Sequence, residues 1–202
     1  DIIEDKSSPF SMPIQYVNRP SLNFRGFCGR VSSGNLCIGD EIEVSNSKET
    51  ASIKEIFLGD HNVKECQKGD SVTITLNKEI DISRGDIVTI SGDHIETTNG
   101  VLATIVWFGS EPSFSNRSFI MKSAHSQIKC DLMKIKHKID INSYQQTKAD
   151  KLEMNDIAMC ELALDKNSSL QSFSENKDLG NFILIDKKTN LTVAAGIINH
   201  HL

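Results

Sequence analysis

The chain has 202 residues, which is enough for one large domain or for two domains of about 100 residues each. Hydrophobic residues make up 38% and charged residues 24%, which is typical of a soluble globular protein. The net charge of −5 argues against a nucleic-acid-binding surface over the whole protein, although a local basic patch is compatible with it. No apolar run reaches the roughly 20 residues that cross a bilayer, so no membrane segment is predicted.

Residues 1–12 are interpreted as a linker, because Ser7, Ser8, Pro9 and Ser11 interrupt any hydrophobic periodicity there. The start of the chain has neither the basic region nor the apolar core of a signal peptide. It also lacks a methionine, which suggests a piece of a longer chain.

The first predicted domain covers residues 13–93 and consists of short strands between Gly-Asp turns. Glycine tolerates positive φ and aspartate accepts hydrogen bonds from nearby backbone N–H groups, so the pair suits tight turns. The Gly-Asp pairs are residues 39–40, 59–60, 69–70, 85–86 and 92–93. The expected strands are 13–18, 23–32, 40–45, 50–58, 70–76 and 86–91. Evenly spaced turns between short strands predict a small closed or sandwiched β domain.

A domain boundary is predicted within residues 92–100, which contain turn formers and no apolar run. The second domain, residues 101–199, is also predicted to be β, because no apolar stripe of useful length follows the helical period. Its expected strands are 101–108, 117–122, 126–137, 157–165, 181–186 and 191–198. A helical turn or two is expected only within 144–154 or 170–177. The chain is therefore predicted to be all-β.

Segment 126–139 is predicted to contain a bulge. Ile128, Cys130 and Leu132 alternate on one face. The apolar residues that fall on the other face are Met133, Ile135 and Ile139. One inserted residue would switch the buried face in mid-strand. A basic strip on the exposed face consists of Lys129, Lys134, Lys136, His137 and Lys138. It is interpreted either as a solvated face that discourages edge pairing or as a site for phosphate or an acidic partner.

The five cysteines are interpreted as free thiols in a reducing, cytoplasmic compartment. Their number is odd and no Cys-x-x-Cys pair occurs, so neither a disulfide set nor a zinc site is indicated. Cys130 and Cys160 lie in alternating apolar segments, which predicts that both are buried.

No catalytic constellation is present in the sequence. There is no Gly-Lys dipeptide, and therefore no phosphate-binding loop of the Walker type. The patterns Gly-x-Gly-x-x-Gly, Gly-x-Ser-x-Gly and His-Glu-x-x-His are also missing. Residues 176–178 (Asn-Lys-Asp) are similar to a guanine-reading Asn-Lys-x-Asp, but the aspartate comes one residue early. We therefore assign no catalytic, cofactor-binding or metal-binding residue.

Several segments combine into a more specific pattern. In the first half they are Met12–Pro20 (MPIQYVNRP), Phe24–Gly29 (FRGFCG) and Glu79–Asp86 (EIDISRGD). In the second half they are Val106–Phe108, Glu111–Pro112, Phe182–Asp186 (FILID) and Thr189–Gly196 (TNLTVAAG). Together they resemble domains 2 and 3 of the large, GTP-hydrolysing subunit of bacterial sulfate adenylyltransferase (ATP sulfurylase), which is related to the translation elongation factors. The chain departs from that pattern at Lys177, where an arginine is expected, and at residues 168–170, where a proline is usual.

The resemblance implies two consecutive β-barrels of the translation-factor type. It implies a heterodimeric enzyme in which a small subunit transfers adenylyl from ATP to sulfate, giving adenosine 5′-phosphosulfate and pyrophosphate. GTP and Mg²⁺ would bind to an N-terminal GTPase domain outside this chain, and ATP would bind to the small subunit. An adenylylsulfate kinase domain downstream is compatible with the resemblance. The residues present would couple GTP hydrolysis to sulfate activation without catalysing a reaction themselves.

Exposed charges in the resembling segments are the candidates for contact with the small subunit: Arg19, Arg25, Arg84 and Asp178. Each has a purely structural alternative, such as bracing a strand or pairing across a turn. Two other functions stay open, an RNA-binding pair of barrels from a translation-factor-like GTPase and a generic β interaction module. The acidity of the chain argues against RNA as a partner.

Overall fold

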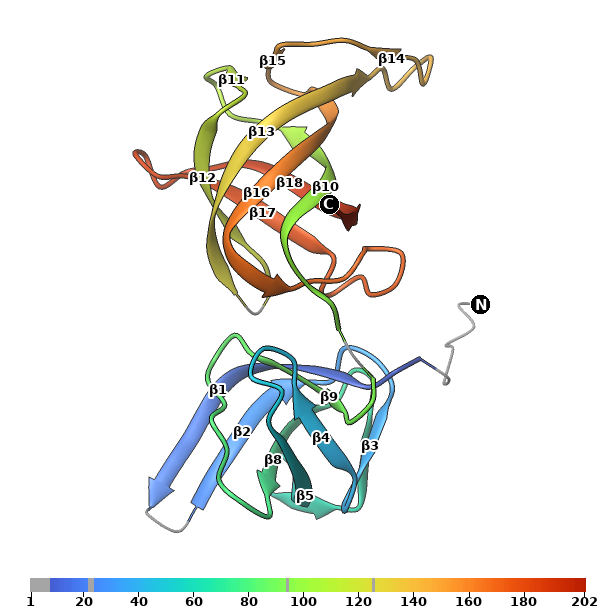
Figure 1. Cartoon of the computed structure of the whole chain (residues 1–202), viewed down its shortest axis with the longest axis vertical. Helices are drawn as coiled ribbons and strands as arrows, with labels where there is room; N and C mark the ends of the chain where they lie inside the picture. Colours follow the sequence, from blue (N-terminus) through green and yellow to red (C-terminus); the bar gives the residue numbers. More distant parts are fainter. Residues whose placement is uncertain (1–7, 22–23, 94, 125) are drawn as a thin grey trace. The chain divides into compact units, whose positions relative to one another are not determined.

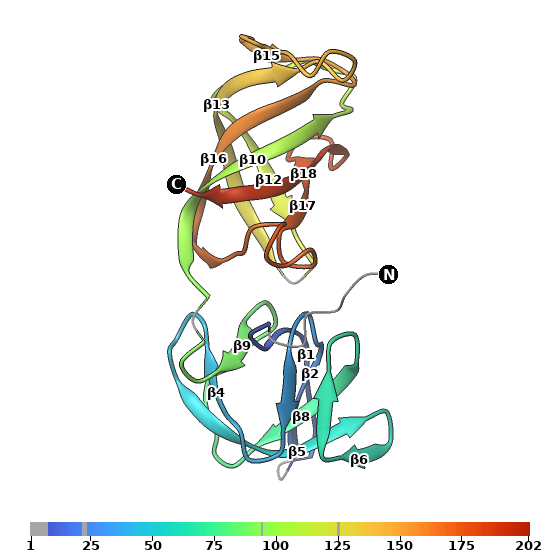
Figure 2. The same cartoon turned by 90° about the vertical axis from the view of Figure 1, so that its right-hand side faces the viewer.

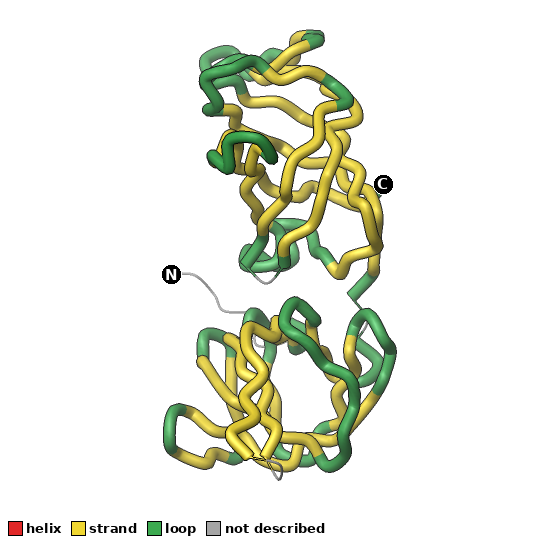
Figure 3. The backbone as a smooth tube through the Cα atoms, turned by 90° about the vertical axis from the view of Figure 1, so that its left-hand side faces the viewer, coloured by secondary structure: helices red, strands yellow, loops and turns green. Residues whose placement is uncertain are grey.

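The computed structural model describes residues 8–21, 24–93, 95–124 and 126–202. All the regular structure in these ranges is β-strand, which confirms the all-β prediction (Figure 3). The chain divides into two compact units, Asp1–Glu96 and Thr97–Leu202 (Figure 1). The helical turns expected within 144–154 and 170–177 are wrong. The first segment instead contains β14 (Gln146–Thr147) and β15 (Lys151–Leu152), and the second is a turn.

The first unit is a closed six-stranded antiparallel barrel in the order β4-β9-β1-β2-β8-β5, which the β4–β5 pairing closes. Its strands are β1 (Ser11–Ser21), β2 (Phe24–Arg30), β4 (Glu41–Val44), β5 (Thr50–Leu58), β8 (Ser71–Leu76) and β9 (Ile87–Ile90). Short strands add β6 (His61–Val63) to β5 and pair β3 (Asn35–Cys37) with β7 (Glu65–Gln67). Strand β1 starts before residue 13 because Ser11 and Met12 pair with Thr89 and Val88. Residues 1–7 of the expected linker lie outside the described residues.

The second unit is a closed six-stranded barrel in the order β12-β17-β18-β10-β16-β13, which the β12–β13 pairing closes. Its strands are β10 (Thr97–Trp107), β12 (Arg117–Lys122), β13 (Gln127–Ile139), β16 (Ile157–Ser169), β17 (Asn181–Asp186) and β18 (Thr192–His201). Strands β16, β10 and β18 lie side by side (Figure 2). A short pair joins β11 (Ser113–Phe114) to β15, and β14 extends β13.

Each barrel has its own core of inward-facing side chains. The first core contains Phe10, Met12, Ile14, Val72 and Ile74, so alternate residues of β8 point into the barrel. In the second core Trp107 is fully buried and meets Phe119 edge-on, with ring centroids 5.7 Å apart. Edge-to-face contact of this kind stabilises beyond the buried area itself.

Three of the Gly-Asp pairs form the same turn. Gly39, Gly69 and Gly85 have φ of 93–99°, in the left-handed region that favours glycine. The following carboxylates each accept a hydrogen bond from the backbone N–H three residues earlier, at 2.8–2.9 Å: Asp40 from Cys37, Asp70 from Gln67 and Asp86 from Ser83. The turn chemistry expected of these pairs is thus present in the fold.

Strand β13 switches its buried face, with two irregularities instead of one. Its register against β16 shifts between Leu132 and Lys134 and again between Ile135 and His137. Cys130, Leu132 and Ile135 are buried, but Met133 is the extra residue of the first bulge and its side chain is 47% exposed. A bulge leaves one residue unpaired and bends the strand. The predicted switch is confirmed, and the expected burial of Met133 is wrong.

The five thiols are expected to fall into two classes of reactivity. Burial raises the pKa of Cys66, Cys130 and Cys160 to about 12, so these thiols are protonated and shielded. Cys28 and Cys37 are partly exposed. Mass spectrometry after brief iodoacetamide treatment is expected to find adducts at Cys28 and Cys37 first, and at the other three only after denaturant is added. Equal labelling of all five in the native protein would contradict the two cores.

Candidate partner-binding surfaces

Two hollows stand out on the surface of the described residues, and both are shallow. One, of about 360 Å³, lies on the second barrel, and one of about 240 Å³ lies on the first. Within the described ranges, no group of three or more His, Cys, Asp and Glu side chains is arranged to hold a metal ion. The same ranges contain no helix long and apolar enough to cross a membrane. The functional surfaces must therefore be sought on the outside of the barrels.

Two candidate arginines on the first barrel hold the same segment, residues 79–82. Arg25 donates hydrogen bonds to the carbonyl oxygens of Ile80 at 3.1 Å and Ile82 at 3.3 Å, and its guanidinium lies 5.1 Å from the ring centroid of Phe27. Arg19 forms a 3.5 Å ion pair with Glu79, and both side chains are at least half exposed. Arg25 is therefore a brace between β2 and this segment, whereas Arg19 leaves much of its side chain available to a partner.

The other two candidates lie on turns in different barrels. Arg84 is exposed in the turn that Asp86 closes through the N–H of Ser83. Asp178 is exposed and follows the buried Asn176, whose side-chain oxygen accepts hydrogen bonds from the N–H groups of Asp178 and Leu179. Residues 176–178 therefore build a local turn. Arg19 and Arg25 thus contact the same segment, Arg84 lies in the turn that follows it, and Asp178 belongs to the second barrel.

The basic strip of β13 is divided by ion pairs. Lys136 pairs with Glu161, and Lys138 pairs with Asp156. His137 is partly buried next to the second bulge. Lys129 lies at the other end of the strand and instead lines the larger hollow. The strip is thus not one continuous cationic surface, because partners from β16 and the turn before it neutralise two of its lysines.

A different set of residues gathers around Lys129, on the outer surface of β12, β13, β17 and the end of β16, and in the turn after β17. We name it the lysine–isoleucine face, and it consists of Ile120, Lys122, Lys129, Lys166, Ile183, Ile185 and Lys187. Ile120 pairs with Lys129 on β13 and with Ile185 on β17, while Lys122 pairs with Ile183. Their side chains point away from the core because the alternate residues Phe119 and Met121 are buried.

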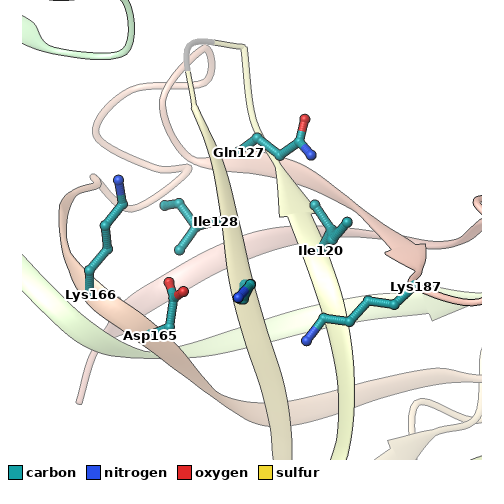
Figure 4. Close-up of a pocket in the computed structure, with 7 residues that line it drawn as sticks. Ile120, Gln127, Ile128, Asp165, Lys166 and Lys187 are labelled. Carbon is teal, nitrogen blue, oxygen red and sulfur yellow. The ribbon is translucent and has the colours of Figure 1, made fainter.

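The hollow on this face joins residues from separate parts of the chain. The pairing of Cys130 with Leu164 places Asp165 beside Lys129 and Lys166 beside Ile128. Figure 4 shows Lys166 and Lys187 on opposite sides of the strand that carries Ile128. Asp165 lies among the lysines of the hollow. Because the three lysines Lys129, Lys166 and Lys187 outnumber this one carboxylate, the hollow is positively charged overall.

An ion pair that sequence reasoning missed fixes the edge of this face. Arg117 on β12 donates to the Asp186 carboxylate at 2.7 Å, and also to the carbonyl oxygen of Pro112 at 3.2 Å. Asp186 is 4% exposed, and it also accepts hydrogen bonds from the N–H groups of Lys188 and Thr189 at 2.9 Å each. The N–H of Thr189, followed by Arg117, lowers the pKa of the Asp186 carboxyl well below its ordinary value of 3.8. The sequence did contain a signal for this ion pair: Asp186 continues the alternation of the buried residues Phe182 and Leu184, which places a carboxylate at an inward position.

Comparison with known families identifies relatives for both barrels. Residues 100–199 match the family model described as GTP-eEF1A C-terminal domain-like. Over its whole length the chain is 40% identical to sulfate adenylyltransferase subunit 1 of Vibrio atlanticus, of which it covers 43%. It is 41% identical over 189 residues to sulfate adenylyltransferase subunit 1 of Saccharophagus degradans, covering 94% of this chain and 40% of that protein. The chain thus spans less than half the length of these curated relatives.

Solved structures share the fold at lower identity. The crystal structure of Sup35 complexed with GDP superposes with a TM-score of 0.87 at 20% identity, covering 96% of this chain and 48% of that one. Sup35 complexed with GMPPNP gives a TM-score of 0.86. These matches confirm the pair of barrels of the translation-factor type and carry information about the fold alone.

Removing the carboxylate of Asp186 is expected to destabilise the second barrel. The Asp186→Asn variant loses charge-assisted hydrogen bonds, which contribute about 1.5–3 kcal/mol to the free energy of unfolding. Because the folded-state pKa is depressed, the wild-type stabilisation is complete above about pH 4 and is lost as the pH falls below that value. Urea unfolding between pH 3 and 7 is expected to show a wild-type advantage that shrinks in acid. An advantage independent of pH would contradict the role of the ionised carboxylate.

The arginines of the first barrel are expected to differ in structural weight. Arg25→Lys loses at least one of two hydrogen bonds and the planar contact with Phe27, so urea unfolding is expected to show a loss of about 1–2 kcal/mol. Arg84→Lys is the matched control, and its exposed position predicts a change within about 0.5 kcal/mol. Equal losses in the two variants would refute the bracing role of Arg25.

Proposed function

Because the chain belongs to the family of sulfate adenylyltransferase subunit 1, we propose that it is the two-barrel part of the GTP-hydrolysing subunit of a sulfate adenylyltransferase. The assembled enzyme transfers the adenylyl group of ATP to sulfate, forming adenosine 5′-phosphosulfate and releasing pyrophosphate. GTP hydrolysis drives this unfavourable reaction. The identity of about 40% along the entire chain is the observation that carries the proposal.

The two barrels serve as a coupling segment in this proposal. The outer surfaces described above offer sites for contact, and the curated relatives extend well beyond the matched region, which leaves room for a nucleotide-binding domain. Sup35, whose crystal structures hold GDP or GMPPNP, likewise extends to about twice the matched length. GTP and Mg²⁺ are assigned to the part of the parent protein outside this chain, and ATP to a second subunit. The parent protein is placed in the cytoplasm, in keeping with the free thiols.

The second subunit is the proposed partner of the barrels. The designation "subunit 1" of the relatives supports an assembly with another subunit. Arg19, Arg84 and Asp178 stay candidates for its contacts, and Arg25 is a candidate that also braces the fold. RNA is disfavoured as a partner because the basic strip of β13, the candidate surface for phosphate groups, is partly neutralised by ion pairs.

The proposal is tested with the full-length protein, the second subunit and the isolated 202-residue chain. Sulfate-dependent release of pyrophosphate from ATP is expected to require both full-length subunits and to increase with GTP. Calorimetry is expected to show GTP binding by the full-length protein and none by the isolated chain. GTP hydrolysis by the isolated chain, or pyrophosphate release indifferent to GTP, would overturn the assignment.

A further inference from the structure

We propose that the lysine–isoleucine face is the surface on which the second barrel binds the second subunit, and that the complementary surface is apolar at its centre and acidic at its rim. This inference rests on the proposed function, because it takes the partner from there. It assigns the contact to a face that none of the four charges selected from the sequence occupies.

The first observation is a continuous apolar row on the outside of the barrel. Ile183 on β17 pairs with Ala195 on β18, and Ala195 pairs with Val106 on β10. Val106 pairs in turn with Ile157 on β16. Val106 is 40% exposed and the other three are partly exposed. Outward positions of a barrel in water are usually polar, so an aliphatic row across four neighbouring strands is typical of a face that a partner covers.

Two more isoleucines broaden this row toward the lysines. Ile120 and Ile185 pair across β12 and β17, and both are partly exposed. Branched aliphatic side chains on paired strands form a stiff surface, because their χ1 angles are restricted. Little side-chain entropy is lost when such a surface is buried. The row therefore suits the desolvated centre of a protein interface.

The second observation is the charge of the rim. Four lysines and one aspartate border the isoleucines: Lys122, Lys129, Lys166, Lys187 and Asp165. They give a local charge of +3 in a chain whose net charge is −5. Among the described residues, none of these four lysines forms an ion pair with a carboxylate, unlike Lys136, Lys138 and Lys151 of the same barrel. An excess of unpaired positive charge favours a partner surface with acidic side chains.

The turn that carries Lys187 is held in place before any partner arrives. One oxygen of Asp186 accepts hydrogen bonds from the N–H groups of Lys188 and Thr189, and the other accepts from Arg117 on the neighbouring strand. The N–H of Asn190 donates to the carbonyl oxygen of Asp186 at 2.9 Å. Preorganisation of this kind reduces the entropy lost on binding.

The same observations disfavour other occupants. Single-stranded nucleic acids bind to surfaces that combine positive charge with stacking aromatic side chains, and this face contains lysines and isoleucines instead. A small oxyanion would need convergent donors in a partly enclosed site, whereas Lys129, Lys166 and Lys187 are exposed. An apolar row would contribute nothing to either ligand. A protein surface uses both the row and the rim.

The test measures the affinity of the full-length protein for the second subunit by biolayer interferometry at 50 and 300 mM NaCl. The Lys129→Glu/Lys187→Glu variant is expected to weaken binding about tenfold or more, mainly through slower association, and to reduce its dependence on salt. Lys134→Glu/Lys148→Glu is the matched control, with the same charge change at exposed positions of the same barrel away from the face. It is expected to bind within about twofold of the wild type.

A second variant tests the apolar row without changing charge. Ile183→Gln is expected to weaken binding about fivefold or more, mainly through faster dissociation, because it places an amide in the desolvated centre. Thermal unfolding and circular dichroism of each variant establish that the barrels remain folded. Ile38→Gln, at a position that is 42% exposed on the first barrel, is the matched control and is expected to bind like the wild type.

The outcomes separate this inference from the proposed function. If the wild-type protein fails to bind the second subunit, the proposed function is overturned. If the wild type binds and both face variants bind equally well, the function stands and the assignment of the face is wrong. Equal weakening by the control variants would also refute the assignment. The assignment would also be wrong if the face variants lost binding to transfer RNA or to sulfate but bound the second subunit with unchanged affinity.

Discussion

Closure of each sheet into a ring is the constraint on which the rest of the structure depends. The β4–β5 and β12–β13 pairings give every barrel strand a hydrogen-bonded neighbour on both sides. A six-stranded ring has an interior just wide enough for its own inward side chains, and the two clusters of buried residues occupy it. A ligand or partner can therefore be met only by outward side chains, by loops and by turns. This is why the search for function leads to the surface.

The outer surfaces are organised by a few polar groups that join segments distant in sequence. Arg25 joins β2 to residues 80–82, and Arg117 joins β12 to Asp186 at the end of β17. Both guanidinium groups also lie over phenylalanine rings, at 5.1 and 5.4 Å from the centroids. The planar, permanently charged group of arginine can make all these contacts at once. A side chain selected as a candidate for partner binding, such as Arg25, can thus be held by contacts within the fold, which leaves it less free to contact a partner.

Much of the fold could be predicted from local order. The strands and tight turns follow from alternation and from Gly-Asp pairs, both of which act over a few residues. The short pairs β3–β7 and β11–β15 were missed because two or three residues carry no measurable period. The two bulges of β13 required the register of β16, since a sequence shows that a face must switch but not where the extra residues fall.

The local structure of the chain could thus be predicted from the sequence, whereas the proposed binding surface could not. The sequence indicated an all-β chain, buried thiols and the family, because these depend on neighbouring residues and on recurring segments. Only the closed barrel brings Lys129, Lys166 and Lys187 from three different segments to one hollow, and joins Ile183, Ala195 and Val106 into one row. Cross-strand pairing decides such neighbours, and it links positions up to 100 residues apart that no local period connects.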